Sequence, residues 1–301
     1  MMKKNYLPRT KAQWISLITL KLLVKLVFVL AFSLQAQDKF GGATLYTVRD
    51  LMGQDAKETL KAVADIGYKY IEATDYKDGL FYGMKPAEFK AYLNSLGMEP
   101  ISVHQGGVTL ENADQLIADS KAAGFQYFVI PVPPMGHFKF NVKERSMGMS
   151  DEVVFINDVL NTIGEKCAAQ GLKLLYHNHD FEFKPNGQGV VPMDYFLENT
   201  NPAWVNFQMD LFWVTTAGVD PVNYINKYPG RFKMWHVKDR DEQGRFAPVG
   251  LGTIDFARIL SYAETSGLEY YIVEQDMVFD GMQPLEAIKI SHDNLSKFGF
   301  H

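Results

Sequence analysis

Hydrophobic positions beyond residue 40 follow a repeating pattern, in which short apolar runs alternate with longer amphipathic segments that often end at a glycine. The short runs have the length of strands, and the longer segments repeat apolar residues at helical spacing. The runs predict eight strands, Thr44–Val48, Tyr70–Ala73, Ile101–His104, Phe128–Pro131, Leu172–Tyr176, Val205–Asp210, Phe232–Val237 and Tyr270–Glu274. The segments predict eight helices, Asp55–Ile66, Pro86–Leu96, Asn112–Ala123, Ser150–Gln170, Met193–Asn199, Pro221–Lys227, Asp255–Ser266 and Pro284–Phe298.

Eight β-α alternations without a break in composition favour an α/β fold, a single (β/α)8 TIM barrel over residues 40–301. A doubly wound open sheet is the alternative. That fold usually carries a G-x-G-x-x-G turn after an early strand, and neither of the first two predicted strands is followed by one. The segment Pro131–Met149 is expected to be a long loop that either stacks on a sugar or forms ordinary surface.

The N-terminal residues differ in kind from the rest. Basic residues precede an apolar stretch, Trp14–Leu34, and Leu34-Gln35-Ala36 resembles a small-residue cleavage site. The uninterrupted apolar part, Leu26–Leu34, is too short to span a bilayer. We therefore expect residues 1–36 to be a secretory signal peptide of an exported, periplasmic protein that keeps no stable membrane association. An uncleaved N-terminal membrane anchor is the alternative.

Composition, net charge and the cysteine count indicate which classes of protein the chain can belong to. The chain of 301 residues has 47% hydrophobic and 22% charged residues, as expected of a globular protein. Its net charge of −5 argues against nucleic acid as the main partner. The single cysteine, Cys167, lies in a predicted helix and is expected to be a buried structural thiol, so neither an internal disulfide nor a cysteine metal cluster is expected.

Polar residues gather at the carboxyl ends of the predicted strands, where a TIM barrel builds its active site. Side chains alternate along a strand, so His177 and His179 point the same way. The last four strands end in a mixed nitrogen and oxygen ligand set, His177, Asp210, His236 and Glu274. Such a set suits one divalent ion, Mn²⁺, Zn²⁺, Co²⁺ or Mg²⁺, with open positions for substrate oxygens.

From Thr44 to the C-terminus the chain resembles the xylose isomerase-like TIM-barrel superfamily of sugar isomerases, ketose 3-epimerases, inosose and dehydroshikimate dehydratases and the endonuclease IV branch. The matching segments, in order, are Tyr70-Ile-Glu72, Ser102-Val-His104, His177-Asn-His179, Met209-Asp210, His236-Val-Lys238-Asp239, Gly250-Leu-Gly252-Thr-Ile-Asp255-Phe256 and Val273-Glu274. The H-V-K-D and G-x-G-x-I-D-F segments are the most specific. The resemblance implies that the family's four metal ligands fall on His177, Asp210, His236 and Glu274, and that the chain forms a homo-oligomer.

The chain departs from the family at His177, where many members have glutamate. In the ketose 3-epimerases two metal-bound glutamates act as acid and base, and here only Glu274 remains of that pair. A metal-bound imidazole is a poor proton acceptor because its lone pair is already used. The second acid or base is expected among four residues, Glu182, His179, Lys238 and His104. Substrate contacts are expected from Glu72, Trp213 and Asp239.

The leading hypothesis is a metal-dependent enzyme that removes a proton next to a carbonyl of a sugar or keto-sugar, with Glu274 as base. Reprotonation would make it an isomerase or epimerase. Loss of a β-substituent would make it a lyase acting on a keto-sugar or keto-glycoside. A non-catalytic sugar-binding barrel is an alternative of another class, and the acidic balance and expected export disfavour a nuclease.

Overall fold

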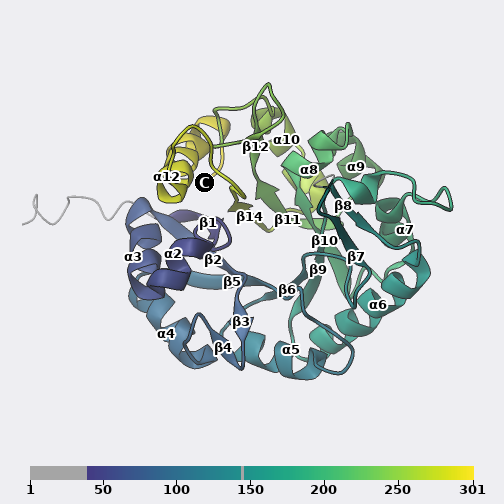
Figure 1. Ribbon diagram of the computed structural model, residues 1–301, viewed down its shortest axis with the longest axis horizontal. Coiled ribbons are helices and arrows are strands. Elements are labelled where there is room, and N and C mark those ends of the chain that lie inside the picture. Colours follow the sequence, from purple (N-terminus) through teal and green to yellow (C-terminus); the bar gives the residue numbers. More distant parts are fainter. Residues whose placement is uncertain (1–38, 144–145) are drawn as a thin grey trace, which may run out of the picture. The chain divides into compact units, whose positions relative to one another are not determined.

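The computed structural model describes residues 39–143 and 146–301, so the predicted signal peptide lies outside the described residues. Parallel strands close into a barrel with helices around it (Figure 1). In sequence order, which is also their order around the barrel, the strands are β1 (Phe40–Thr44), β2 (Tyr68–Ala73), β5 (Glu99–His104), β6 (Tyr127–Ile130), β9 (Lys173–His177), β10 (Val205–Asp210), β11 (Phe232–Val237) and β14 (Tyr270–Val273). The predicted (β/α)8 barrel is confirmed.

Helices between the strands cover the outside of the barrel. They are α3 (Ala56–Ile66), α4 (Pro86–Ser95), α5 (Ala113–Ala122), α6 (Val153–Ala169), α7 (Pro192–Asn199), α9 (Pro221–Lys227), α10 (Phe256–Leu260), α11 (Ala263–Ser266) and α12 (Pro284–Leu295). Shorter helices follow strand ends or finish the chain, α2 (Arg49–Gln54), η1 (Phe181–Phe183), α8 (Leu211–Thr216) and η2 (Ser296–Phe298). None of the helices in the described ranges is both long and apolar enough to cross a membrane.

Local chemistry explains where these helices begin and end. The Asp55 carboxylate accepts hydrogen bonds from the backbone N–H groups of Lys57 and Glu58 and so caps α3. Gly67 ends the same helix in the left-handed region, with φ of 117°. The single helix predicted over Asp255–Ser266 is wrong, because the Ser261 hydroxyl bonds to the Arg258 carbonyl at 2.6 Å and the chain leaves helical geometry there.

The first strand lies four residues earlier than predicted. Of the predicted run Thr44–Val48, only Thr44 belongs to β1, and residues 45–48 form a turn beyond the strand end. The strand β1 also contains two glycines, which sequence rules count against a strand. Gly42 is required by close packing, because a Cβ there would lie 2.3 Å from the Ile272 side chain of β14. The glycines therefore let β1 approach its neighbours and close the barrel.

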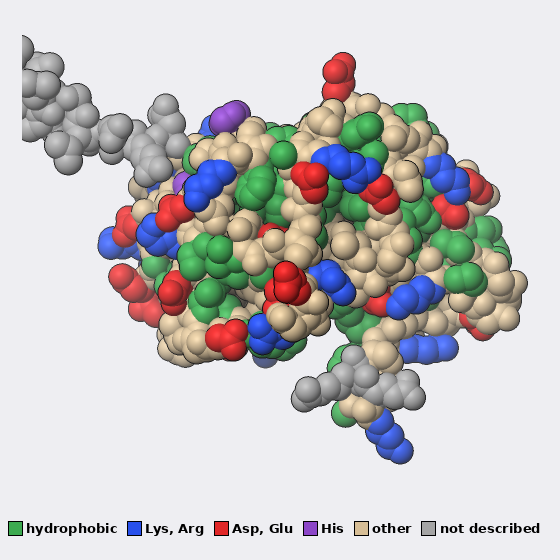
Figure 2. Space-filling model, turned by 90° about the horizontal axis from the view of Figure 1, so that it is seen from above, with side chains coloured by type: hydrophobic (Ala, Val, Ile, Leu, Met, Phe, Trp, Pro, Cys, Tyr) green, Lys and Arg blue, Asp and Glu red, His purple; other side chains and the backbone are tan. Residues whose placement is uncertain are grey.

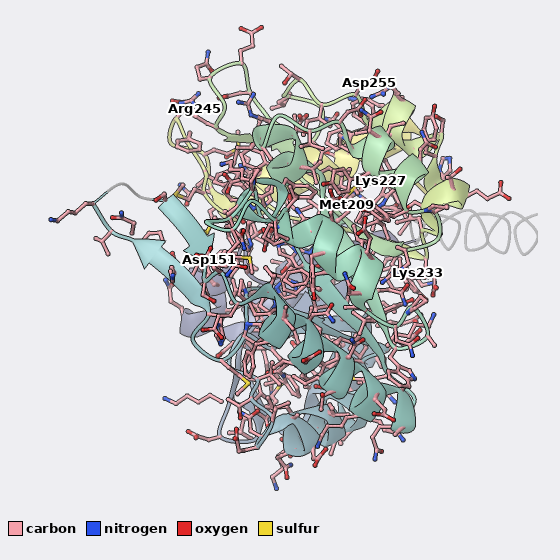
Figure 3. All side chains as sticks on the ribbon, turned by 90° about the vertical axis from the view of Figure 1, so that its right-hand side faces the viewer. Asp151, Met209, Lys227, Lys233, Arg245 and Asp255 are labelled. Carbon is pink, nitrogen blue, oxygen red and sulfur yellow. The ribbon has the colours of Figure 1, made fainter. Side chains whose placement is uncertain are left out.

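The segment Pro131–Met149 is more ordered than predicted. It contains an antiparallel hairpin of β7 (Phe138–Asn141) and β8 (Ser146–Met149), in which Phe140 faces Met147. The alternation of aromatic and polar residues from Phe138 onward is the missed strand signal. In Figure 3 this hairpin lies toward the same end of the barrel as the labelled Arg245, and Lys233 at the start of β11 lies toward the other end. The hairpin thus stands at the carboxyl ends of the strands.

The barrel interior is filled by a separate apolar cluster, distinct from the larger core between strands and helices. Its buried members are Ile101, Tyr127, Val129, Leu175, Met234 and Ile272. Two residues further along their strands, the inward positions after Leu175, Met234 and Ile272 become polar. Because inward positions recur at every second residue, each of these strands places an apolar side chain inside the barrel and a polar side chain at its carboxyl end. We call the surface formed by these polar side chains the polar floor.

The surface carries both signs of charge. On the face in Figure 2, acidic and basic side chains are interspersed and form no continuous basic patch among the described residues. Two further hairpins, β3 (Tyr76–Lys77) with β4 (Leu80–Phe81) and β12 (Asp239–Arg240) with β13 (Phe246–Ala247), extend the loops after β2 and β11.

Candidate metal centre

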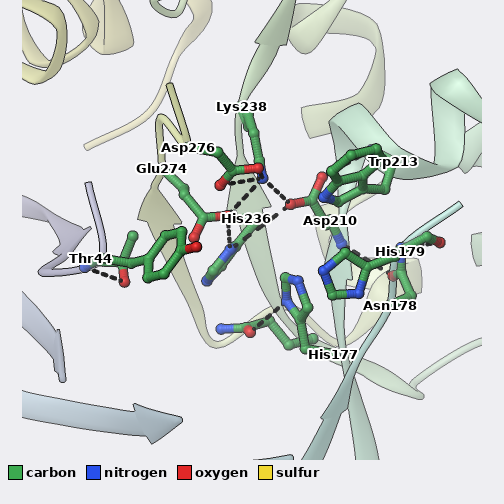
Figure 4. Close-up of polar contacts among 12 residues, drawn as sticks. Thr44, His177, Asn178, His179, Asp210, Trp213, His236, Lys238, Glu274 and Asp276 are labelled. Carbon is green, nitrogen blue, oxygen red and sulfur yellow. Dashed lines mark hydrogen bonds and ion pairs between the residues drawn. The ribbon is translucent and has the colours of Figure 1, made fainter. Parts of the chain in front are cut away.

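Four buried side chains meet at the polar floor. His177 ends β9, Asp210 ends β10, His236 lies in β11 and Glu274 directly follows β14. Each offers one ligand atom, and these atoms all lie within 4.8 Å of one another. His236 Nδ1 lies 3.0 Å from Glu274 Oε2 and 3.9 Å from Asp210 Oδ2 (Figure 4). The strands thus bring together the ligand set that the sequence predicts.

The second nitrogen of each histidine is held by a residue beneath the floor. His177 Nδ1 lies 2.9 Å from Gln208 Oε1, and His236 Nε2 lies 2.7 Å from Glu72 Oε1. Metal-bound histidines characteristically donate their other N–H to such an acceptor, which fixes the ring and leaves one lone pair free. Burial lowers the pKa of His236, but the Glu72 and Glu274 carboxylates raise it overall to about 10. A divalent cation would take the place of the Nδ1 proton.

The Asp210 carboxylate supplies a direct test of whether a cation fits. Its Oδ1 accepts the backbone N–H of Trp213 at 2.9 Å, and Asn178 Oδ1 accepts the Asp210 N–H at 3.1 Å. Its Oδ2 is buried and accepts no hydrogen bond from the residues that the structure describes, although the Lys238 ammonium lies 3.0 Å away. A buried carboxylate oxygen without a hydrogen bond is costly, and a cation would satisfy it. The residues present therefore fit a divalent ion.

A second ligand set shares two of these histidines. His104, His177 and His236 also bring ligand atoms within 4.8 Å of one another. This set leaves Asp210 Oδ2 without a hydrogen bond and uses no carboxylate, although the Asp210 and Glu274 carboxylates both adjoin His236 Nδ1. The mixed set of two histidines and two carboxylates is therefore the better site, and it suits Zn²⁺, Mn²⁺, Co²⁺ or Mg²⁺.

Lys238 is a buried ammonium group among carboxylates. Its Nζ lies 2.7 Å from Glu274 Oε2, 3.0 Å from Asp210 Oδ2 and 2.9 Å from Asp276 Oδ2. Burial lowers the pKa of Lys238, but these three carboxylates raise it well above its usual range. Burial in turn raises the pKa of Glu274, but Lys238 and then His236 hold it well below its usual range. Glu274 is therefore an ionised carboxylate, able to bind a cation or accept a proton.

A cavity of about 590 Å³ lies over this centre. Of the predicted residues, His104, His177, His179, Trp213, Lys238 and Glu274 line it. Its apolar wall comprises Pro131, Val132, Phe140, Met147, Phe246 and Met277. The volume lies within the range of about 300–1,000 Å³ that is usual for small-molecule pockets.

His179 presents an unused nitrogen to this cavity. Its ring stacks on Phe181, with 5.6 Å between centroids, and packs against Trp213. Its Nδ1 is buried and has no hydrogen-bond partner in the described part of the chain. Burial, and then the Lys238 ammonium, lower the pKa of His179 to about 3, so this imidazole is neutral.

Three of the predicted residues, Glu72, Asp239 and Glu182, do not line the cavity. Their carboxylate oxygens accept hydrogen bonds from neighbouring groups of the fold. Glu72 is buried beneath the floor, where its Oε2 accepts hydrogen bonds from Ser102 and Gln208. Asp239 is expected to contact substrate, but it accepts the backbone N–H groups of Gly250, Gly252 and Ile254 and so holds the G-x-G loop. Glu182 accepts the Tyr176 hydroxyl and the His179 N–H, at 2.7 and 2.8 Å. All three position other groups.

Two residues of the centre are absent from the sequence-based predictions. Gln208 links the histidines, because its Oε1 lies 3.0 Å from His104 Nε2 and 2.9 Å from His177 Nδ1 while its Nε2 donates to Glu72. Asp276 pairs with Lys238. Gln208 lies two residues before Asp210 in β10, so the alternation along that strand was the signal that could have found it. Asp276 lies beyond the end of β14, where strand alternation gives no signal.

Glu182 gives a pH-dependent test of the fold. Burial raises its pKa to about 8, so between about pH 4.5 and pH 8 the folded chain binds a proton that the unfolded chain has lost. This group's contribution to stability is therefore full below about pH 4.5 and declines as the pH rises to about 8. Urea unfolding of Glu182→Gln should show a shallower loss of stability over this range than the unchanged protein. Equal slopes would contradict the assignment.

Comparisons with known proteins agree with this fold. The family model of the xylose isomerase-like TIM barrel matches residues 60–289. The inosose dehydratase of Lacticaseibacillus casei is 26% identical over 176 residues, which are 49% of this chain and 58% of that enzyme. The chain thus spans little more than half the length of this curated relative.

Solved structures match over a longer stretch. A sugar phosphate isomerase/epimerase from Parabacteroides distasonis is 25% identical, with a TM-score of 0.71 over 87% of this chain and 95% of that chain. The IOLI protein, whose structure contains a zinc atom, is 17% identical, with a TM-score of 0.64 over 86% of this chain and 97% of that chain; this likeness shows the fold. With its fold and with the family model matched over most of its length, the chain belongs to the xylose isomerase-like TIM barrel family.

Proposed function

We propose that the chain is a divalent-metal-dependent enzyme that removes a proton next to a carbonyl of a sugar or keto-sugar. The observation that carries this proposal is the ligand set at the cavity floor, where His177, His236 and an Asp210 oxygen without a hydrogen bond adjoin an ionised Glu274. The inosose dehydratase and the sugar phosphate isomerase/epimerase are named for this kind of chemistry, which supports the same conclusion.

Each residue of the centre has a role that follows from its chemistry. A bound divalent cation would polarise the carbonyl and make the adjacent C–H more acidic. Glu274, ionised and at the edge of the cavity, accepts the proton. The Lys238 ammonium stabilises negative charge that develops on a substrate oxygen. His179, with its unpartnered Nδ1, bonds to a substrate hydroxyl from the same cavity. Gln208 and Glu72 hold the two ligating imidazoles in orientation.

A lyase is the second candidate function. The family's second glutamate is replaced by His177, so the ligand set keeps one glutamate, beside the Lys238 ammonium, rather than two matched glutamates. This asymmetry suits removal of a proton by Glu274 and protonation of a departing β-substituent by another group. The curated relative is a dehydratase, which agrees with an elimination.

Export remains part of the proposal. It rests on the basic and apolar pattern of residues 1–36, and it favours an unphosphorylated substrate. Arg49 lines the cavity, but its guanidinium donates to the Tyr46 and Asp276 carbonyl oxygens, at 2.9 and 3.1 Å.

Isotope exchange tests the proposal. The Mn²⁺-loaded protein is incubated in heavy water with a panel of ketoses, inososes and keto-glycosides, and the sugars are analysed by mass spectrometry and NMR. Incorporation of deuterium next to the carbonyl, lost on chelation and in Glu274→Gln, is the expected result. Formation of an unsaturated ketone identifies the lyase. Sugar binding without exchange or elimination would contradict the proposal and favour a non-catalytic sugar-binding barrel.

A further inference from the structure

A second cavity adjoins the one above the metal centre. It measures about 510 Å³ and shares Thr74, His104 and Gly106 with the first cavity. Its other walls come from the loops that follow β2 and β5. Both volumes lie in the range of small-molecule pockets, so the two cavities together offer room for a ligand of two linked units.

The two cavities differ in chemistry. The first has an apolar wall that includes Phe140, Met147 and Trp213, which suits the face of one sugar ring. The second is lined by two carboxylate acceptors, an ammonium donor and a carboxamide, on Asp75, Asp78, Lys77 and Gln105. Carboxylate and carboxamide groups recognise the hydroxyls of polyhydroxylated ligands, because each can form more than one hydrogen bond.

Gln105 indicates that the second cavity is made for a ligand. Its side chain is only 5% exposed, and its Nε2 has no hydrogen-bond partner within the described ranges. An amide that is buried without a partner costs free energy, and a hydroxyl of a ligand in this cavity can accept its N–H. The same residue lines the second cavity, so a small shift of its side chain would bring the unused donor to a ligand there.

Two glycines line the second cavity, and one of them, Gly106, also lines the first. A Cβ at Gly107 would meet no atom within 4 Å, and a Cβ at Gly106 would meet only the Pro131 ring, at 3.5 Å. Neither glycine has a left-handed backbone. A larger side chain can therefore be introduced at Gly107 without a clash at its Cβ, and a ligand that extends from one cavity to the other would pass beside the shared residues Gly106 and His104.

We propose that the second cavity is a subsite for a second sugar ring or a comparable polyhydroxylated unit, so that the substrate is a disaccharide or a glycoside rather than a free monosaccharide. This inference rests on the proposed function for the ring in the first cavity. It assigns Gln105 as a specificity-determining residue. It also identifies Gly107 as a position at which a larger side chain would block the subsite.

The test compares affinities for one-unit and two-unit sugars. Calorimetry with the Mn²⁺-loaded protein uses cellobiose, maltose, lactose and trehalose beside glucose, galactose and their methyl glycosides, which have no second ring. At least one disaccharide should bind about tenfold or more tightly than its parent monosaccharide or methyl glycoside. Gly107→Phe fills the subsite and should remove this advantage while changing the monosaccharide Kd by less than about twofold. Gln105→Leu should reduce the advantage in the same direction.

A matched glycine controls for the added ring. Gly53, in α2, has equally open surroundings, because a Cβ at this position would also meet no atom within 4 Å. Gly53→Phe should therefore leave both affinities unchanged. The subsite is refuted if no two-unit sugar binds more tightly than its parent, or if Gly107→Phe weakens both kinds of sugar equally.

The isotope experiment separates this inference from the proposed function. Exchange into a monosaccharide, with no preference for two-unit sugars, would refute the subsite and leave the proposed function standing. A disaccharide preference that Gly107→Phe abolishes, without exchange or elimination in any sugar, would support the subsite and contradict the enzyme activity.

Discussion

Asp210→Asn is expected to weaken Mn²⁺ binding by roughly 100-fold or more and to remove metal-dependent exchange, because removal of a ligand should cost at least as much as removal of a supporting residue. The substitution keeps the size of the side chain, and the amide oxygen can still accept the Trp213 N–H, so the start of α8 is retained. The negative charge at the buried Oδ2 is lost. Calorimetric titration with Mn²⁺ and Zn²⁺ measures the effect.

Asp276→Asn is the matched control for this prediction. Asp276 also pairs with Lys238, but it does not belong to the four residues whose ligand atoms meet. Its substitution should change metal affinity by only a few-fold. Equal metal affinities of the Asp210 variant and the unchanged protein would show that the ion is not held at this floor.

Lys238→Met is expected to destabilise the metal-free protein by about 3–5 kcal/mol, because it leaves the buried carboxylates of Asp210, Glu274 and Asp276 without their shared cation. A saturating divalent ion should restore part of this loss, since it supplies positive charge to Asp210 and Glu274. Urea unfolding with a chelator and with Mn²⁺ measures both effects.

Lys173→Met shows what an exposed lysine contributes. Lys173 begins β9 and pairs with Glu269 at the amino ends of the strands, away from the metal centre. Its side chain is 52% exposed, so its loss should cost about 1 kcal/mol or less and show no metal dependence. If Lys238→Met is as stable as the unchanged protein in chelator, the ammonium does not neutralise the centre and the proposed charge balance is wrong.

The barrel and its ligand set could be predicted because they depend on periodicity. Eight alternations specify the architecture, and the period of two places His177 and His236 on the inner face above Leu175 and Met234. The first strand could not be found in this way, because Gly42 is retained for close packing against Ile272 rather than for strand propensity. The hairpin at Phe138 was hidden in a segment whose composition is typical of a loop.

Individual roles at the strand ends could not be predicted, because they depend on which atoms are already satisfied. Glu72 and Asp239 occupy strand ends as expected, yet their oxygens accept hydrogen bonds from side chains and backbone of the fold itself. Glu182 is close to His179 in sequence but faces Tyr176. Residue type and face follow from the sequence, whereas only the packed structure shows whether a carboxylate remains available.

Crystallography of the Mn²⁺-soaked protein with anomalous diffraction tests the central claim most directly. The account predicts a single anomalous peak about 2.0–2.3 Å from one ligand atom of each of four residues, His177, Asp210, His236 and Glu274. The Lys238 ammonium should remain beside Asp276. A peak bound by His104, His177 and His236 without either carboxylate, or no peak at the cavity floor, would contradict the account.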